Sequence, residues 1–248
     1  MRGRLPVLSG GKPDNTRWGE RVMAYANQAS AAVFEYIVNN IRSGKWIPGM
    51  KIETEEQLGQ SLNVSRIAVR QALEKLDALG VLKRQQGSGT YVNCFQDASL
   101  EGMIYYPATQ ERFLTVLEFR RMFDSCNVEL FIQHATIGER AELERNYREM
   151  INRRNDKDQF DLYDNAFHQM IAFGTHNALI IQISKVLTEL LVRYQALQYE
   201  TAGPDHAIKW HGIILDAIQH NNTQLAHICA QTHIENSIHK VKAQIGKE

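Results

Sequence analysis

Two helix signals and one hairpin signal follow one another closely between residues 54 and 92. Thr54 can cap a short helix, and Gln57 three residues later completes a capping box. Ser65 can cap a longer helix. The apolar face of that helix is formed by Val69, Ala72, Leu73, Leu76 and Leu79. Two strand-like runs around a glycine-rich turn then predict a β-hairpin within residues 81–92. Helix, turn, helix and hairpin in this order predict a winged helix-turn-helix.

The rest of the chain is predicted to be mainly α-helical. Apolar residues at spacings of three and four indicate a helix over residues 31–42. No strand-like alternation interrupts the chain beyond residue 110, so the second part is predicted to be an all-α helical bundle. Its helices are expected near 111–136, 137–154, 159–174, 178–200, 205–220 and 222–243. We therefore predict an N-terminal extension at 1–28, a winged helix-turn-helix domain at 29–95, a linker at 96–109 and an all-helical domain at 110–243.

Composition separates the two parts chemically. Residues 1–95 carry 13 Lys and Arg against 8 Asp and Glu, whereas the whole chain has a net charge of zero. A basic N-terminal part fits a polyanionic partner. All nine histidines lie between His134 and His239, so metal chemistry is expected in the C-terminal part. Three scattered cysteines, no signal-peptide core and no long apolar run predict a cytoplasmic protein without a membrane partner.

The start of the longer helix carries the candidate DNA-reading residues. The first turn of a helix inserted into the major groove lies near base edges and phosphates. Arg66 and Arg70 are four residues apart, so they project from one face and can contact guanine or phosphate. Glycines at the hairpin tip would allow close approach to DNA. The predicted DNA-binding residues are Ser65, Arg66, Ile67, Ala68, Arg70, Gly87 and Gly89. A solvated helix face and an ordinary turn are the alternative interpretation.

Residues 51–92 resemble the DNA-binding domain of the GntR family of regulators. The shared elements are a Val-Ser-Arg turn, Val-Arg-x-Ala-Leu, Leu-x-x-x-Gly and a Gly-x-Gly-Thr-x-Val wing. The resemblance implies a winged helix-turn-helix that binds a double-stranded DNA operator. One position departs from the family, because Glu56 stands where many members have arginine. A family contact at this position therefore cannot be transferred.

The C-terminal part contains a candidate metal site. Asp164 and His168 are four residues apart on a predicted helix, so both can bind one ion. His211 and His233 lie in later helices with apolar neighbours. One Asp and three His suit zinc, nickel, manganese or iron. The alternative is that these histidines are buried and satisfy internal hydrogen bonds.

Residues 111–240 resemble the FCD domain, the helical effector-binding module of the FadR-type branch of the GntR family. The resemblance implies a divalent transition metal held by Asp164, His168, His211 and His233. His206 and His227 are the substitute ligands if the metal-binding histidines have been assigned to the wrong helix. The segment Glu118-Phe119-Arg120 is similar to a family segment whose arginine faces the ligand, which implies effector binding by Arg120. Arg193 is a second candidate for the same role.

These expectations combine into a DNA-binding transcriptional regulator. A small carboxylic acid bound by the metal and Arg120 would change the affinity for the operator. A homodimer is expected, because a two-fold protein reads a two-fold operator. The alternatives are a metal-responsive regulator, a metal-dependent enzyme fused to a DNA-binding domain, and a metal with a purely structural role.

Overall fold

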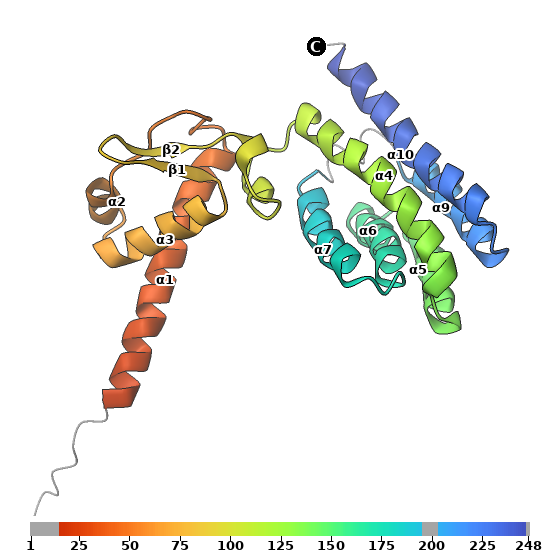
Figure 1. Ribbon diagram of the computed structural model, residues 1–248, viewed down its shortest axis with the longest axis horizontal. Helices are drawn as coiled ribbons and strands as arrows, with labels where there is room; N and C mark the ends of the chain where they lie inside the picture. Colours follow the sequence, from red (N-terminus) through yellow and green to blue (C-terminus); the bar gives the residue numbers. More distant parts are fainter. Residues whose placement is uncertain (1–14, 195–202, 247–248) are drawn as a thin grey trace, which may run out of the picture. The chain divides into compact units, whose positions relative to one another are not determined.

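The computed structural model describes residues 15–194 and 203–246, and it divides into two compact units (Figure 1). The first unit ends at Tyr106, and the second begins at Pro107. Among the helices described, none is both long and apolar enough to cross a membrane. The fold is mainly α-helical, and its only sheet within the described residues is a two-stranded hairpin in the first unit.

The N-terminal unit has the predicted winged helix-turn-helix order. Its elements are α1 (Asn15–Arg42), α2 (Glu55–Ser61), α3 (Arg66–Ala78), β1 (Leu82–Gln85), β2 (Gly89–Val92) and two 3₁₀ turns, η1 (Phe95–Asp97) and η2 (Gly102–Tyr105). Helix α3 packs on α1 through a core that includes Ile37, Leu58, Leu73 and Leu76. Burial of these apolar side chains supplies the main stabilising free energy of such a small unit.

The local signals that predicted α2, α3 and the hairpin are confirmed. The Thr54 hydroxyl accepts a hydrogen bond from the amide of Gln57 at 3.2 Å, and the Gln57 side chain accepts from the amide of Thr54 at 2.9 Å. Ser65 caps α3 by accepting from the amide of Ala68 at 3.2 Å. In the hairpin, Gly87 has a φ of 73°. Glycine reaches this left-handed region without steric cost, so the tight turn forms there.

Helix α1 is longer than predicted. It begins at Asn15, so residues 15–28 continue the helix that was expected over 31–42. Adding a residue to an existing helix avoids the cost of nucleation, and half of the residues in this stretch, Ala24 and Ala26 among them, have good helix propensity. The absence of an apolar period had indicated an extension. A periodic spacing of apolar residues indicates only that one face of a helix is buried, and a helix can continue where the sequence has no such spacing.

The predicted linker at 96–109 also differs from the structure. Residues up to Tyr106 pack on the N-terminal unit, and the boundary between the units follows Tyr106. The Tyr106 hydroxyl donates to the carbonyl of Asn93 at 3.0 Å. Its ring meets that of Phe95 edge to face, with the ring centroids 5.6 Å apart. Burial of these aromatic rings holds the segment in place, and irregular backbone gives no periodic signal of it.

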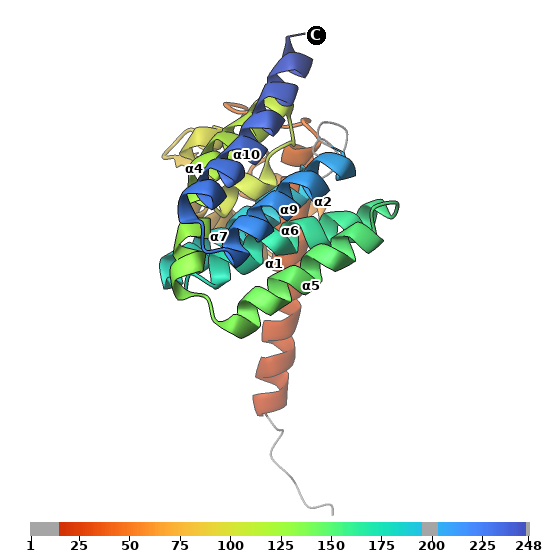
Figure 2. The same cartoon turned by 90° about the vertical axis from the view of Figure 1, so that its right-hand side faces the viewer.

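The C-terminal unit is the predicted bundle. Its helices are α4 (Gln110–His134), α5 (Ile137–Asn152), α6 (Lys157–Phe173), α7 (Ala178–Val192), α9 (Pro204–Gln219) and α10 (Thr223–Ile245). Residues 195–200 of the expected fourth helix lie outside the described residues. Helices α4 and α10 run side by side along most of their length (Figures 1 and 2). The core between them and α6 and α9 includes Val128, Phe131, Phe167, Ile214 and Ile218.

Candidate metal centre and nucleic-acid interface

Three helices of the C-terminal unit bring three histidines to one point. His168 comes from α6, His211 from α9 and His233 from α10, and one ring nitrogen of each lies within 4.8 Å of the others. The Nε2 atoms of His168 and His211 are 3.1 Å apart. The His211 ring stacks on Phe167, with centroids 4.2 Å apart and planes 6° apart, which fixes its orientation. Three of the four predicted ligands therefore form one cluster.

The donor set of this cluster fits a transition metal. Two imidazole nitrogens that bind one ion at about 2.1 Å lie about 3 Å apart when their bonds are near a right angle. Burial, followed by the neighbouring His168, lowers the pKa of both His211 and His233 well below the ordinary value. Both rings are therefore neutral at pH 7, the form that binds metals. Within the described residues, the Nδ1 atoms of His211 and His233 are buried without a hydrogen-bond partner.

Asp164, the fourth predicted ligand, lies beside the cluster. It is buried on α6, one turn before His168. Its Oδ1 is 3.7 Å from the Nε2 of His211, but no carboxylate oxygen belongs to the mutual group formed by the three histidines among the described residues. A carboxylate at this place can complete a set of three nitrogens and one oxygen.

Asp124 is a site residue that the sequence prediction missed. Its Oδ2 lies 3.2 Å from the Nδ1 of His168 and accepts a hydrogen bond from the Nε of Arg120 at 3.0 Å. Burial raises the pKa of Asp124, but Arg120 and His168 outweigh this effect and hold it at about 2. An ionised carboxylate on Nδ1 orients the ring of His168 and leaves its Nε2 directed at the cluster. The spacing of four between Arg120 and Asp124 was the available signal.

The two predicted effector residues have different places. Arg120 is 2% exposed, and burial, His168 and then Arg120 lower the pKa of His233, so its charge acts on the cluster. Arg193 instead follows the last residue of α7 and is exposed. The cluster is buried, so the structure does not bring the exposed Arg193 to it.

The two substitute histidines also separate. The His206 ring lies beside the cluster, with its centroid 5.6 Å from that of His233. His227 pairs with Glu129 between α10 and α4. A pocket beside His168 is lined by the polar side chains of Asp124 and Asn127 and by apolar residues of α6, α9 and α10. Its volume of about 10 Å³ is near the lower limit for a single water molecule, so an organic ligand would need side chains around the cluster to move.

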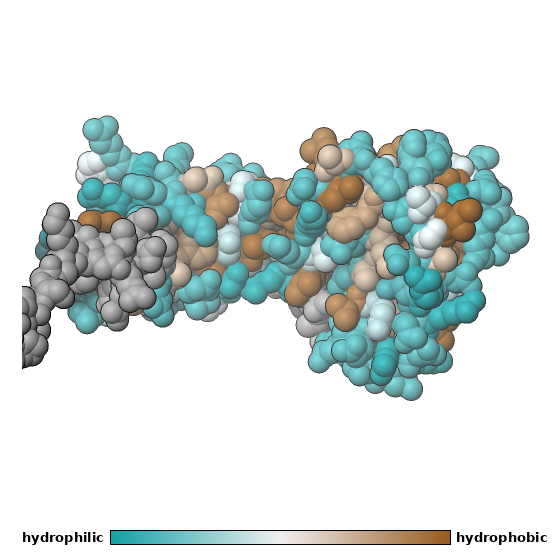
Figure 3. Space-filling model, turned by 90° about the horizontal axis from the view of Figure 1, so that it is seen from below, coloured by the Kyte–Doolittle hydropathy of each residue, from teal (hydrophilic) through white to brown (hydrophobic). Residues whose placement is uncertain are grey.

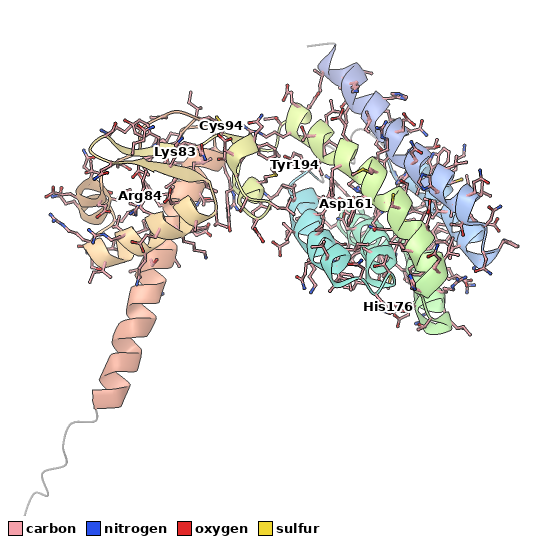
Figure 4. The ribbon with its side chains drawn as sticks, in the orientation of Figure 1. Lys83, Arg84, Cys94, Asp161, His176 and Tyr194 are labelled. Carbon is pink, nitrogen blue, oxygen red and sulfur yellow. The ribbon has the colours of Figure 1, made fainter. Side chains whose placement is uncertain are left out.

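Asp161, labelled in Figure 4, is a buried carboxyl one turn before Asp164. Burial, followed by the charge of Asp164, raises the pKa of Asp161 to about 6. This value exceeds the unfolded value of about 3.9. The contribution of Asp161 to stability is therefore complete below about pH 4 and is lost as the pH rises through 6.

In the metal-free protein, Asp161→Asn is expected to raise the free energy of unfolding at pH 7 by about 1–3 kcal/mol. At pH 4 the carboxyl is protonated in the folded state and about half protonated in the unfolded state, so the gain should largely disappear. Urea unfolding of both proteins at the two pH values measures this difference. An equal gain at pH 4 and pH 7 would assign the effect to packing of the amide instead of the charge.

The candidate DNA surface lies at the start of α3. Arg66, Ile67 and Arg70 are exposed there, and Ile67 is 69% exposed. Ser65 is exposed as well, but its hydroxyl caps the helix. Ala68 is 0% exposed and faces the core, so its side chain is not available to DNA, and its place among the DNA-binding residues stays a prediction for its backbone alone. The first turn of a helix has one side that packs on the core and one side that faces solvent. The sequence spacing alone did not show that Ala68 lies on the side that faces the core.

The wing lies next to this helix in the same unit. Gly87 and Gly89 form the turn between β1 and β2, both with positive φ. Lys83 and Arg84, labelled in Figure 4, belong to β1. Glu55 of α2 lies 3.1 Å from Arg70 and 4.0 Å from Arg84. This carboxylate of α2 contacts both α3 and the wing, so Arg70 and Arg84 are held near one another.

Two family models match the chain. The model described as bacterial regulatory proteins, gntR family, matches residues 29–92, and the FCD domain model matches residues 115–236. The first match covers the winged helix-turn-helix, and the second covers most of the helical bundle with its histidine cluster. The two matches coincide with the two units of the structure.

Curated relatives and solved structures agree with these matches. The galactonate operon transcriptional repressor of Escherichia coli strain K12 is 22% identical over 207 residues, which cover 80% of this chain and 90% of that protein. The HTH-type transcriptional regulator LutR of Bacillus subtilis strain 168 is 27% identical over 154 residues, covering 61% and 70%.

The solved structure of Lar, which controls the expression of the Listeria monocytogenes agr system, has the same fold. It aligns with a TM-score of 0.65 at 16% identity, over 86% of this chain and 96% of that chain. These relatives are regulators of transcription and not enzymes. The chain is therefore a transcriptional regulator of the gntR family, with a winged helix-turn-helix followed by an FCD domain.

Proposed function

We propose that a small carboxylic acid, bound at a divalent transition metal in the C-terminal unit, changes the affinity of this regulator for its DNA operator. The observation that carries the proposal is the convergence of His168, His211 and His233 on one point, with Arg120 and Asp124 beside it. The donor set suits zinc, nickel, manganese or iron. His168, His211, His233 and Asp164 would hold the ion, which would supply positive charge for an anionic ligand.

The class of acid follows from the coordination and from one relative. A metal that prefers six ligands has two positions left after three histidines and one aspartate. A carboxylate with a neighbouring hydroxyl can fill two adjacent positions. The name of the Escherichia coli relative refers to galactonate, a sugar acid with this arrangement. Sugar acids are therefore the first class to test, followed by dicarboxylates.

Arg120 sets the specificity for an anion in this proposal. Its guanidinium is buried and pairs with Asp124 at 2.9 Å. An incoming carboxylate would compete with Asp124 for this guanidinium, whose planar fork suits bidentate binding. The exchange would also change the partner of the His168 ring, since Asp124 contacts both residues. Such a ligand alters DNA affinity only if it binds one arrangement of the protein more tightly than another.

The test is a titration of metal-loaded full-length protein on operator DNA with galactonate and with dicarboxylates. We expect an effective acid to change operator affinity by about tenfold, which corresponds to about 1.4 kcal/mol of coupling. Chelation of the metal should remove this response. Arg120→Lys should weaken the response, whereas Arg193→Ala should retain it. An operator affinity that no acid changes, with the metal present, contradicts the proposal.

A metal-responsive regulator is the second candidate. It is favoured by the pairing of Arg120 with Asp124, which already occupies the guanidinium that an acid would need. In this case the metal alone would change operator affinity, and acids would add nothing. The titration therefore includes metal without acid as a separate arm.

We also propose that the regulator acts as a homodimer. Apolar side chains are exposed on the outer faces of α4 and α10, among them Phe119 at 38%, Met122 at 61% and Ile228 at 50%. Figure 3 shows that other apolar residues are exposed among hydrophilic ones on the face of the C-terminal unit that is seen from below. A second copy that covers such a surface would give a two-fold protein for a two-fold operator. Sedimentation of the full chain at operator-binding concentrations measures the state directly.

A further inference from the structure

Glu56 pairs with a candidate DNA-reading residue across the helix-turn-helix. It lies in the first turn of α2, and Arg66 is the first residue of α3. The Glu56 Oε1 accepts a hydrogen bond from the Arg66 Nη2 at 3.3 Å. The two side chains are 63% and 72% exposed, respectively. A pair this exposed adds little to stability, so its main consequence concerns what the surface presents to a partner.

The neighbouring Glu55 has a different role. Its side chain is 33% exposed and lies against Arg70 and Arg84. Because Glu55 is partly buried and contacts arginines of both α3 and the wing, it stabilises the packing of these elements within the unit. Glu56 contacts one arginine and extends into solvent. Only Glu56 is therefore free to meet a ligand that approaches the start of α3.

A lone carboxylate on a DNA-binding surface repels phosphate. Glu56 is neutralised by Arg66, however, so the pair approaches DNA with no net charge. Arginine has five N–H donors, and the bond to Glu56 occupies one of them. The pair therefore presents donors from Arg66 next to the free carboxylate oxygen of Glu56. In the major groove, arginine pairs with the O6 and N7 of guanine, and glutamate accepts from the N4 amine of cytosine.

We infer that Glu56 and Arg66 form one base-reading group, in which Arg66 selects a guanine and Glu56 selects a cytosine within reach of it. This inference depends on the proposed reading of the operator by the start of α3. Glu56 is then a specificity-determining residue. A carboxylate accepts from the N4 amine of cytosine, has no donor for guanine O6 or thymine O4, and at adenine meets the acceptor N7 beside the N6 amine. Each half-site of the operator should contain guanine and cytosine at neighbouring positions.

The test compares base preferences of three proteins on a pool of randomised double-stranded DNA. The proteins are the wild type, Glu56→Gln, and Asp77→Asn, which removes one negative charge at the other end of α3. The wild type should prefer cytosine at one position of each half-site by about tenfold. Glutamine pairs bidentately with adenine, so Glu56→Gln should transfer the preference at that position from cytosine to adenine. Asp77→Asn should have the preferences of the wild type.

The outcomes separate this inference from the proposed function. Uniformly tighter binding of Glu56→Gln, with every base preference retained, would overturn the inference, because Glu56 would then act only through its charge. Wild-type protein that selects no sequence would contradict operator reading itself, and the inference with it. Both side chains are exposed, so the substitution should leave the fold unchanged, and equal thermal unfolding of the three proteins verifies this.

Discussion

Replacing His211 by alanine is expected to abolish stoichiometric metal binding. The wild type, purified without added metal, should contain about one transition metal per chain by elemental analysis. His211 is 0% exposed, and its Nε2 lies 3.1 Å from that of His168 and 3.7 Å from Asp164. The His211 ring therefore lies close to two of the other predicted metal ligands, His168 and Asp164. Loss of an outer-sphere partner already costs about 10–100-fold in metal affinity, and loss of a ligand should cost more.

The stability of the variant needs its own control. His211 stacks on Phe167, so alanine leaves a cavity and lowers stability with or without metal. The decisive quantity is the increase in Tm on adding metal, which should be several degrees for the wild type and absent for His211→Ala, because only a bound ligand stabilises by mass action. His220→Ala, at the exposed C-terminal end of the same helix, should behave as the wild type. If His211→Ala contains as much metal as the wild type, His211 is not a ligand, and the alternative that these buried histidines only satisfy internal hydrogen bonds is favoured.

Arg66→Ala is expected to weaken operator binding by about 10–100-fold, because a bidentate contact to a guanine contributes about 1–3 kcal/mol. Arg66 is the first residue of α3, and its side chain is 72% exposed, so it is available to DNA without rearrangement of the core. Removing one positive charge should also lower the slope of the logarithm of affinity against the logarithm of salt concentration by about one. Binding to the selected operator over a range of salt concentrations measures both effects.

Arg66→Lys is the matched variant for this prediction. Lysine keeps the charge but lacks the planar fork. If Arg66 contacts a base, Arg66→Lys should keep the salt dependence and lose most of the discrimination between operator and other DNA. If Arg66 contacts only phosphate, Arg66→Lys should bind as the wild type does. Operator binding that survives Arg66→Ala unchanged would show that α3 does not read the operator through its first turn.

Features controlled by residues close in sequence were predictable. Thr54, Gln57 and Ser65 cap their helices through contacts over three residues, so the pattern specifies the geometry. The hairpin follows from a glycine turn between two short strand-like runs. Asp164 and His168 share a face of α6 because four residues make about one helical turn. The resemblance to the FCD domain then indicated which later histidines join them.

Features controlled by tertiary packing were not predictable in the same way. The segment 96–106 was expected to be a linker, but the rings of Phe95 and Tyr106 bury it against the N-terminal core. Residues 15–28 continue α1 although no periodic apolar pattern marks them. Ala68 and Ile67 are adjacent in sequence, yet one is 0% and the other 69% exposed. Which side of a helix end is covered depends on the element packed against it.

The sequence by itself determined most of the helices, the caps at Thr54 and Ser65, the hairpin and the residue types of the candidate sites, because these depend on backbone hydrogen bonding and helical repeat. Only the tertiary structure decided that Arg120 is buried against Asp124 while Arg193 is exposed. It also decided that Asp124 orients His168 and that Glu56 pairs with Arg66. Whether a charged side chain faces solvent, a carboxylate or an imidazole depends on which helices pack together, and that choice is made by apolar burial across the whole unit.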